Sequence, residues 1–428
     1  MNITTLENWL RIIINPVKWA KSVTNLILAW AWSRYENQEN RWISHFLEHM
    51  FFKWAKKYQT PKAVAEAVDK FWGEFNAFTW KEYAWYYIKS ASRNLEDWMD
   101  ILSDMLLNSK FDIAEINKER WVILEEMNMY LDMPKYQIAW EFEELIIWNQ
   151  PLWWDQLWTK ELINWVQTED FKKYCKDLYT PDNLIIILSW DVDEENWVKL
   201  VKKYFKNLSW KKAFTWWELK KNDSWEKIRI INKKTEQSHI VIWVKWTPWN
   251  DMENFWKQRV LWTLLWWMMS SRMFQNVREQ KWLCYQISTH TDDYTDFWIF
   301  STSAWVTNEK VDLAIESILK EYKEIVQNVP DQEELDKAKN YLIWKILLST
   351  EDSENMANMY WTQLLLKWKT TEVDEICKKI EKVTLEDISN HAKKILKKEN
   401  IYIAWIWPFW DDWEKNKIWG ELIEKCDF

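Results

Sequence analysis

The stretch His45-Phe46-Leu47-Glu48-His49 carries two imidazoles and one carboxylate at a spacing that suits a metal site with its own base. On a helix, His45 and His49 are four residues apart, so both rings project from one face and can share a metal ion. Glu48 lies beside the second histidine, within reach of a water molecule on that metal. We therefore predict a metal-binding helix here. The competing interpretation is two surface histidines on a charged helix.

The order H-x-x-E-H reverses the commoner H-E-x-x-H and is typical of inverted zincins. A catalytic zinc needs three protein ligands and one open position. In Glu119-Arg120-Trp121-Val122-Ile123-Leu124-Glu125-Glu126, the first and last glutamates share one helix face, whereas Glu125 points about 100° away. We assign Glu126 as the third ligand and Glu119 as the partner that orients a histidine or the water. The residues alone leave the reverse assignment open.

These groups together indicate metal-assisted hydrolysis of an amide. Zinc lowers the pKa of a bound water toward neutrality, so Glu48 can take its proton and deliver it to a leaving amine.

The composition is that of a globular protein, with 428 residues, 48% hydrophobic and 29% charged. The net charge of −9, without a basic stripe, gives no reason to expect nucleic-acid binding. The cysteines form no C-x-x-C pair and suit free thiols in a reducing compartment; they are Cys175, Cys284, Cys377 and Cys426. The first 15 residues lack the basic region of a signal peptide, and the longest apolar run, 260–269, is too short to span a bilayer. We expect a cytoplasmic protein with no membrane contact.

Tryptophan and glycine occur in abnormal numbers, 41 and 2, whereas glycine usually fills about 7% of positions. Tryptophan also stands where glycine chemistry is expected, as in Thr247-Pro248-Trp249-Asn250, which has the pattern of a turn, and at Trp190 after a strand. A bulky residue with positive φ is strained. We hypothesise that most of these positions are glycine in the protein. A lineage that decodes UGA as glycine would give this pattern if its genes were translated with UGA as tryptophan. No residue assigned to chemistry is a tryptophan.

The chain consists of two similar halves with a period near 210 residues, which indicates a duplicated domain. Each half opens with two strands, has a helical middle and ends on a strand that follows a helix. The predicted strands are 10–15, 24–29 and 183–188 in the first half, and 227–232, 239–244 and 400–404 in the second. Within the first half we also predict helices at 62–71, 94–108 and 112–129 and strands at 74–79 and 82–89. The candidate core positions on the last two helices are Leu95, Met99, Leu102, Met105, Leu106, Ile116, Val122, Ile123 and Met127.

The stretch Ile43-Ser44-His45-Phe46-Leu47-Glu48-His49-Met50-Phe51-Phe52-Lys53 resembles the signature of pitrilysin-type metallopeptidases, a family that includes insulin-degrading enzyme and the mitochondrial processing peptidase. The resemblance covers almost the whole chain and suits the short, two-domain branch. It implies one zinc ion per chain, with Glu126 at the family's third ligand and Glu119 at the acidic residue that accompanies it. Tryptophans at the family's glycine positions depart from the pattern; they include Trp42, Trp54, Trp266 and Trp267.

Two further segments carry the resemblance. Phe75-Asn76-Ala77-Phe78-Thr79 resembles the family's active-site edge strand, which implies that Asn76 and Ala77 bind an extended substrate by β-augmentation. The alternative for Asn76 is an ordinary polar residue at a strand end. Arg278 and Tyr285, seven residues apart, match the pair that holds the substrate and stabilises the oxyanion. Without the resemblance, they are a solvated helix charge and a half-buried strand residue.

We therefore expect an α+β fold of two duplicated domains, each a mostly antiparallel sheet with helices packed on it. Residues 1–210 form the zinc-binding catalytic domain, 211–226 the linker, and 227–428 the homologous domain that contributes substrate-binding residues. The expected function is a zinc-dependent endopeptidase that acts on short or unfolded polypeptides, with Glu48 as general base. The resemblance also implies a homodimer. The alternatives are a non-catalytic scaffold or substrate-binding subunit, and an enzyme dedicated to one peptide. We treat His239, His290 and His391 as structural or surface residues.

Overall fold

The computed structural model describes residues 2–15, 22–37, 40–41, 43–70, 72–147, 150–152, 160–189, 193–209, 211–213, 227–246, 252–295, 298–367 and 370–408. The chain divides into two compact units, and each is described by itself. Unit 1 comprises Met1–Met129, Asn149–Lys220 and Ser349–Leu364; unit 2 comprises Tyr130–Trp148, Lys221–Leu348 and Leu365–Phe428. The predicted linker, 211–226, lies outside the described residues except for 211–213.

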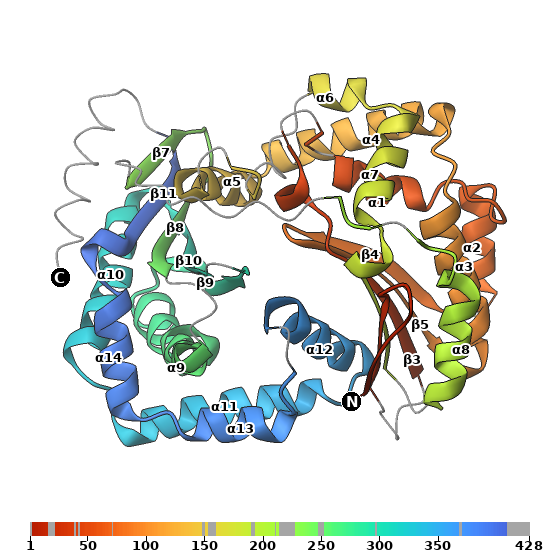
Figure 1. Ribbon diagram of the computed structural model, residues 1–428. Helices are drawn as coiled ribbons and strands as arrows, with labels where there is room; N and C mark the ends of the chain where they lie inside the picture. The colour runs from red at the N-terminus through yellow and green to blue at the C-terminus, as the bar shows by residue number, and fades with distance from the viewer. Residues whose placement is uncertain are drawn as a thin grey trace. The chain divides into compact units, whose positions relative to one another are not determined.

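Unit 1 is built on a six-stranded sheet in the order β1-β2-β6-β3-β5-β4. Its strands β3, β4 and β5 are labelled in Figure 1. Neighbouring strands are antiparallel except β2 and β6, which are parallel. β6 has a neighbour on both sides and is buried along its whole length, which explains its continuous apolar run. The strands are β1 (Asn2–Thr5), β2 (Arg11–Asn15), β3 (Ser22–Ala29), β4 (Glu74–Trp80), β5 (Tyr83–Ala91) and β6 (Leu184–Ser189).

The helices of unit 1 follow the capping and apolar pattern of the sequence. At the start of α2, Thr60 accepts a hydrogen bond from the Ala63 N–H at 3.0 Å, and Pro61 occupies the first turn. On α3, Met99, Leu102 and Met105 are buried, as predicted. The helices are α1 (Ile43–Phe51), α2 (Pro61–Asp69), α3 (Leu95–Asn108), α4 (Ile113–Asp132), α6 (Lys160–Trp165), α7 (Thr168–Leu178), α8 (Glu194–Phe205) and α12 (Ser353–Lys367).

One predicted core position on α4 is wrong. Ile116, Ile123 and Met127 are buried, but Val122 is 43% exposed. Val122 precedes Ile123 by one residue and therefore points about 100° away from the buried face. That face instead includes Glu119, which is only 5% exposed.

Unit 2 contains a five-stranded sheet in the order β7-β11-β8-β10-β9, again with a single parallel pair, β7 and β11. The strands are β7 (Ile228–Asn232), β8 (Gln237–Trp246), β9 (Cys284–Asp293), β10 (Trp298–Thr307) and β11 (Ile401–Trp407). The helices are α5 (Pro134–Ile147), α9 (Met252–Trp262), α10 (Val311–Gln327), α11 (Gln332–Ser349), α13 (Val373–Glu381) and α14 (Leu385–Ile395), with π-helical turns at Thr263–Trp267 and Phe274–Glu279.

The two sheets share one topology. If β1 is left out and the strands of each unit are numbered in chain order, both sheets have the same spatial order: first, fifth, second, fourth and third strand. In both units the first and fifth strands form the parallel pair. The predicted α+β fold of two duplicated, mostly antiparallel sheets is thereby confirmed.

Two helices, one from each half of the sequence, belong to the compact unit that is formed mainly by the other half. From the first half, α5 packs on β8 and β11 (Figure 1). Its Phe142 ring meets Trp243 edge-on, with the ring centroids 5.8 Å apart. From the second half, the start of α12 joins unit 1. Ser353 Oγ lies 3.0 Å from Thr24 Oγ1 on β3, and Asp352 pairs with Lys89 on β5 at 2.5 Å.

Tryptophan occupies backbone positions that favour glycine. Of the four non-glycine residues with positive φ in the described part of the chain, three are tryptophans, at 73° (Trp9), 53° (Trp72) and 52° (Trp282). Four buried indole N–H groups also lack a hydrogen-bond partner among the described residues; they belong to Trp85, Trp197, Trp243 and Trp405. Both observations support the glycine hypothesis. Trp190 and Trp249 lie outside the described residues.

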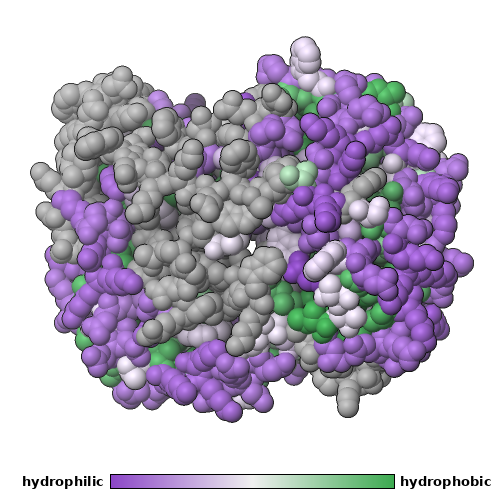
Figure 2. All heavy atoms as spheres, in the orientation of Figure 1, coloured by the Kyte–Doolittle hydropathy of each residue, from purple (hydrophilic) through white to green (hydrophobic). Residues whose placement is uncertain are grey.

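Hydrophilic side chains cover most of the described surface on the face drawn in Figure 2, with smaller hydrophobic areas among them. No helix in the described ranges is long and apolar enough to cross a membrane. Cys175, Cys284 and Cys377 are free thiols, and Cys426 lies outside the described residues.

Candidate metal centre

Helix α1 separates its side chains into a buried face and a reactive face. Its apolar residues recur at helical spacing and are buried; they are Ile43, Phe46, Leu47, Met50 and Phe51. The opposite face carries His45, Glu48 and His49, which are only partly buried. Glu36 fixes the start of the helix by accepting the Ser44 N–H at 3.0 Å. The apolar pattern therefore anchors α1 and leaves the motif side chains accessible.

The structure brings His45, His49 and Glu126 together within unit 1. The two histidine Nε2 atoms lie 3.1 Å apart, and Glu126 Oε2 lies 3.7 Å from His45 Nε2 and 3.5 Å from His49 Nε2. A tetrahedral zinc with ligand bonds of about 2.0–2.1 Å requires ligand separations of about 3.3–3.4 Å. The observed separations fit that geometry, and His₂Glu is a donor set of catalytic zinc. Among the described residues it is the single cluster of three such donors.

Glu119 holds the ring of His49 from the side away from this cluster. Its Oε1 accepts from His49 Nδ1 at 2.8 Å, and its Oε2 accepts from Lys53 Nζ at 2.7 Å. Burial opposes ionisation of Glu119, but the hydrogen bonds from His49 and Lys53 outweigh it and lower the pKa of the carboxyl. Because His49 donates through Nδ1, its Nε2 lone pair remains available for a metal.

The surroundings of His45 favour its unprotonated form. Burial, and then the neighbouring His49 ring, lower the pKa of His45 well below its ordinary value. An unprotonated imidazole can act as a ligand without first losing a proton. The His45 ring is therefore prepared to hold a cation.

Glu48 lies on α1 next to His49, and its carboxyl is affected by the charges of His49 and Glu126. Burial raises the pKa of its carboxyl, and a hydrogen bond from Thr79 Oγ1 to Glu48 Oε2 at 2.6 Å partly opposes that shift. A carboxylate whose pKa is raised above that of an ordinary glutamate is a stronger base, and a pKa nearer the working pH suits general acid–base catalysis.

Strand β4 lies beside α1 at the outer edge of the sheet. Asn76 is exposed, and its Oδ1 accepts the Ala77 N–H at 2.9 Å. Among the described residues no strand pairs with the outer edge of β4, and an unpaired strand edge is the kind of site that can bind an extended chain.

Arg278 and Tyr285 belong to unit 2, on the Phe274–Glu279 turn and on β9. Both line a cavity of about 310 Å³ within that unit. Arg278 lies over the Phe274 ring, 4.7 Å from its centroid, and Tyr285 is 76% exposed. Their predicted contact with substrate stays a prediction.

Sequence reasoning missed Lys53 and Thr79. Period-two alternation along β4 places Thr79 on the same face as Ala77, but it does not reveal that Glu48 is its partner. Lys53 is the last residue of the stretch that resembles the family signature. The sequence does not show that its partner is Glu119, because only the fold brings the two side chains together.

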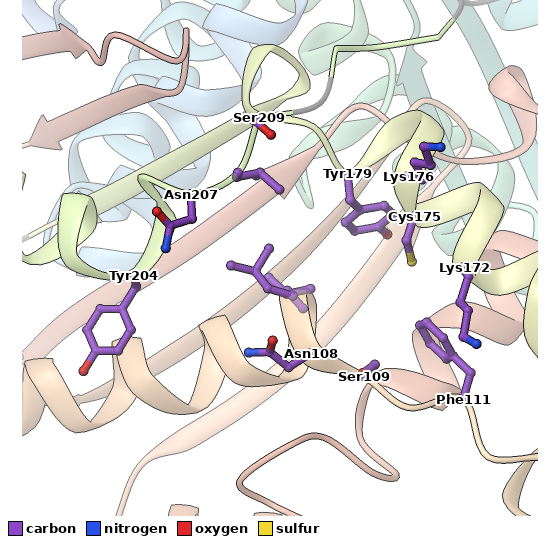
Figure 3. Close-up of a pocket in the computed structure, with 13 residues that line it drawn as sticks. Asn108, Ser109, Phe111, Lys172, Cys175, Lys176, Tyr179, Tyr204, Asn207 and Ser209 are labelled. Atoms are coloured by element: carbon purple, nitrogen blue, oxygen red, sulfur yellow. The ribbon is translucent and has the colours of Figure 1, made fainter.

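A larger cavity in unit 1, of about 730 Å³, is separate from this centre. The ends of α3 and α8 and the side of α7 line it, with Asn108, Lys172, Cys175 and Asn207 among its residues (Figure 3). None of the candidate metal ligands lines it. Burial raises the pKa of the Cys175 thiol far above its ordinary value, which disfavours the reactive thiolate form. His239, His290 and His391 join no metal-binding cluster of described residues.

Two family models match the chain. One, described as Insulinase (Peptidase family M16), matches residues 20–143, and one described as Peptidase M16 inactive domain matches residues 166–342. Together they cover more than half of the chain. The candidate ligands and base all fall within the first match.

Known relatives match over almost their whole length. The chain is 29% identical to the uncharacterized zinc protease YmxG of Bacillus subtilis, over 94% of this chain and 97% of that protein. It is 25% identical to the beta subunit of the mitochondrial-processing peptidase of Dictyostelium discoideum, over 95% of this chain and 88% of that protein.

Two solved structures share the fold. A protease from Helicobacter pylori has a TM-score of 0.88 at 21% identity and covers 95% of this chain and 99% of its own. A peptidase M16 inactive domain from Pseudomonas fluorescens has a TM-score of 0.86 at 13% identity, over 96% of this chain and 98% of its own. With the two family models, these likenesses lead to one conclusion: the chain belongs to the M16 (insulinase) family of peptidases, in its short two-domain form.

Proposed function

We propose that this chain is a zinc-dependent endopeptidase that hydrolyses peptide bonds in short or unfolded polypeptides. The observation that carries the proposal is the convergence of His45, His49 and Glu126 beside Glu48. The distances among the three donor groups support a single zinc ion per chain.

Different residues of the chain have different roles in the hydrolysis. When bound, zinc supplies a Lewis acid that polarises the scissile carbonyl and acidifies the attacking water. Glu48 takes a proton from that water and delivers it to the leaving amine. Glu119, with Lys53 behind it, keeps the His49 ring oriented.

Substrate is held by two parts of the chain. The free edge of β4, at Asn76 and Ala77, pairs with an extended peptide backbone. Arg278 and Tyr285 hold the peptide and donate to the oxygen that becomes negative in the transition state. Extended binding at a strand edge excludes folded segments, which explains the preference for short or unfolded chains.

Two further attributes rest on the sequence and the resemblance. We propose that two copies of the chain form a homodimer, which light scattering of the purified protein tests. We also propose a cytoplasmic location, in keeping with the three free thiols.

Metal removal and peptide cleavage test the enzymatic proposal. Peptides with a quenched fluorophore and both termini blocked report internal cleavage only. We expect turnover by the zinc-loaded protein, its loss after dialysis against a chelator, and its recovery on addition of zinc. Zinc binding without cleavage of any peptide would favour the alternative, a non-catalytic scaffold or substrate-binding subunit.

A further inference from the structure

The Glu48 carboxylate, whose role as base belongs to the proposed function, has a partner outside the metal-binding motif. The Thr79 hydroxyl donates to Glu48 Oε2 at 2.6 Å, the short distance of a charge-assisted hydrogen bond. Both side chains are half-buried, so water competes only weakly for this contact.

Strand β4 fixes where that hydroxyl lies. Phe75, Ala77 and Thr79 share one face of the strand because side chains alternate. The same face meets α1 and the turn after it, since the Phe75 ring lies 5.3 Å from the Phe52 ring. A threonine side chain has few rotamers, so the position of β4 sets the position of its hydroxyl.

An ordinary strand threonine does not explain this contact. Threonine is common in strands, where its hydroxyl often bonds to a residue on the next strand. Thr289 and Thr302 show that arrangement in unit 2, with hydroxyls 3.0 Å apart on β9 and β10. Thr79, however, faces Ala84 on β5, which offers no side-chain acceptor, and its hydroxyl turns to Glu48 instead.

We propose that Thr79 is a positioning residue for the base. Its hydroxyl holds Oε2 of Glu48 and leaves Oε1 to accept the proton of the attacking water. Because Thr79 lies two residues after Ala77, the strand that pairs with the peptide also holds the base. Binding of substrate along β4 is thereby coupled to the orientation of Glu48.

Thr79→Val tests this assignment because it keeps the β-branched shape and removes the donor. Thr79→Ser is the matched control, since it keeps the hydroxyl. We expect Thr79→Val to lower kcat by about 10- to 100-fold, the effect of losing a hydrogen bond to a charged group, with KM and zinc content unchanged. Thr79→Ser should restore most of the rate. If Thr79→Val does not fold, Thr79→Ala takes its place.

Two measurements separate positioning from binding and from the enzymatic proposal itself. In a Glu48→Gln background, Thr79→Val should leave the affinity for the peptide unchanged. Crystal structures of the metal-free proteins should show the Glu48 carboxylate displaced in Thr79→Val and restored in Thr79→Ser. A wild-type kcat in Thr79→Val, an effect on KM alone, or an unmoved carboxylate would overturn the role of Thr79. Failure of the wild type to cleave peptides would instead overturn the proposed function. The crystal structures of the variants would even then show whether Thr79 holds the Glu48 carboxylate in place.

Discussion

Glu125 and Glu126 are adjacent on α4 but have different surroundings. Glu126 reaches the two imidazoles, whereas Glu125 is exposed to solvent. We predict that Glu126→Gln weakens zinc binding by more than about 100-fold, since even an outer partner of a metal ligand contributes about 10- to 100-fold. Glu125→Gln should bind zinc as the wild type does. Titration with a competing chelator measures both, and equal affinities for the two variants would remove Glu126 from the ligand set.

Trp9, Trp72 and Trp282 have positive φ, which a side chain as large as indole rarely adopts. Glycine has no such restriction, and it is nearly missing from the chain. We predict that peptide mass spectrometry of the protein from its natural source shows glycine at these three positions. Tryptophan masses there would refute the hypothesis of UGA decoding.

The residues of the candidate site differ in how far sequence reveals them. His45, Glu48 and His49 belong to one helix, so their spacing alone predicts that they share a face. Glu126 and Glu119 required a second helix, which the resemblance aligned with the first. Lys53 and Thr79 find their partners only through packing of α1 against α4 and β4, and no spacing rule encodes that packing.

At the scale of elements, β4 combines an ordinary strand pattern with an exposed position at the sheet edge. The Ala77 N–H donates to the Asn76 side chain and not to β5. The substitution Ala77→Pro therefore removes no hydrogen bond between β4 and β5. We predict that Ala77→Pro raises KM for peptides by about 2- to 10-fold, through loss of one backbone donor to the substrate. Ala77→Val, which keeps the N–H, is the control. Equal KM values in steady-state assays of the two variants would exclude β4 as the peptide-binding edge.

Most strands and helices of unit 1 follow from local pattern. The predicted strand at 74–79 corresponds to β4, and the predicted helix at 112–129 to α4. Val122 does not follow this pattern: it is apolar and adjacent to the buried Ile123, but it lies about 100° around the helix and is exposed. The burial of Glu119 could not be predicted from hydropathy, since its partners His49 and Lys53 lie far away in the sequence.

For the whole molecule, two similar sequence halves correctly indicated a duplicated α+β fold, because each half repeats its strands in the same order. The exchange of α5 and α12 between units was beyond the sequence. The exchange depends on which sheet face each helix covers. The packing of Phe142 on α5 against Trp243 on β8 is one such contact, and long-range packing of this kind leaves no periodic signal in the sequence. The candidate ligands His45, His49 and Glu126 all lie within the region that the insulinase family model matches.

The central claim is that Glu48 acts as the base beside a zinc ion held by His45, His49 and Glu126. Zinc content and turnover of a quenched peptide, measured on the same preparations of wild type and Glu48→Gln, test it most directly. The claim predicts equal zinc in both proteins and loss of turnover in the variant by at least about 100-fold, the usual contribution of a general base. A Glu48→Gln protein that retains zinc and cleaves at the wild-type rate would contradict it.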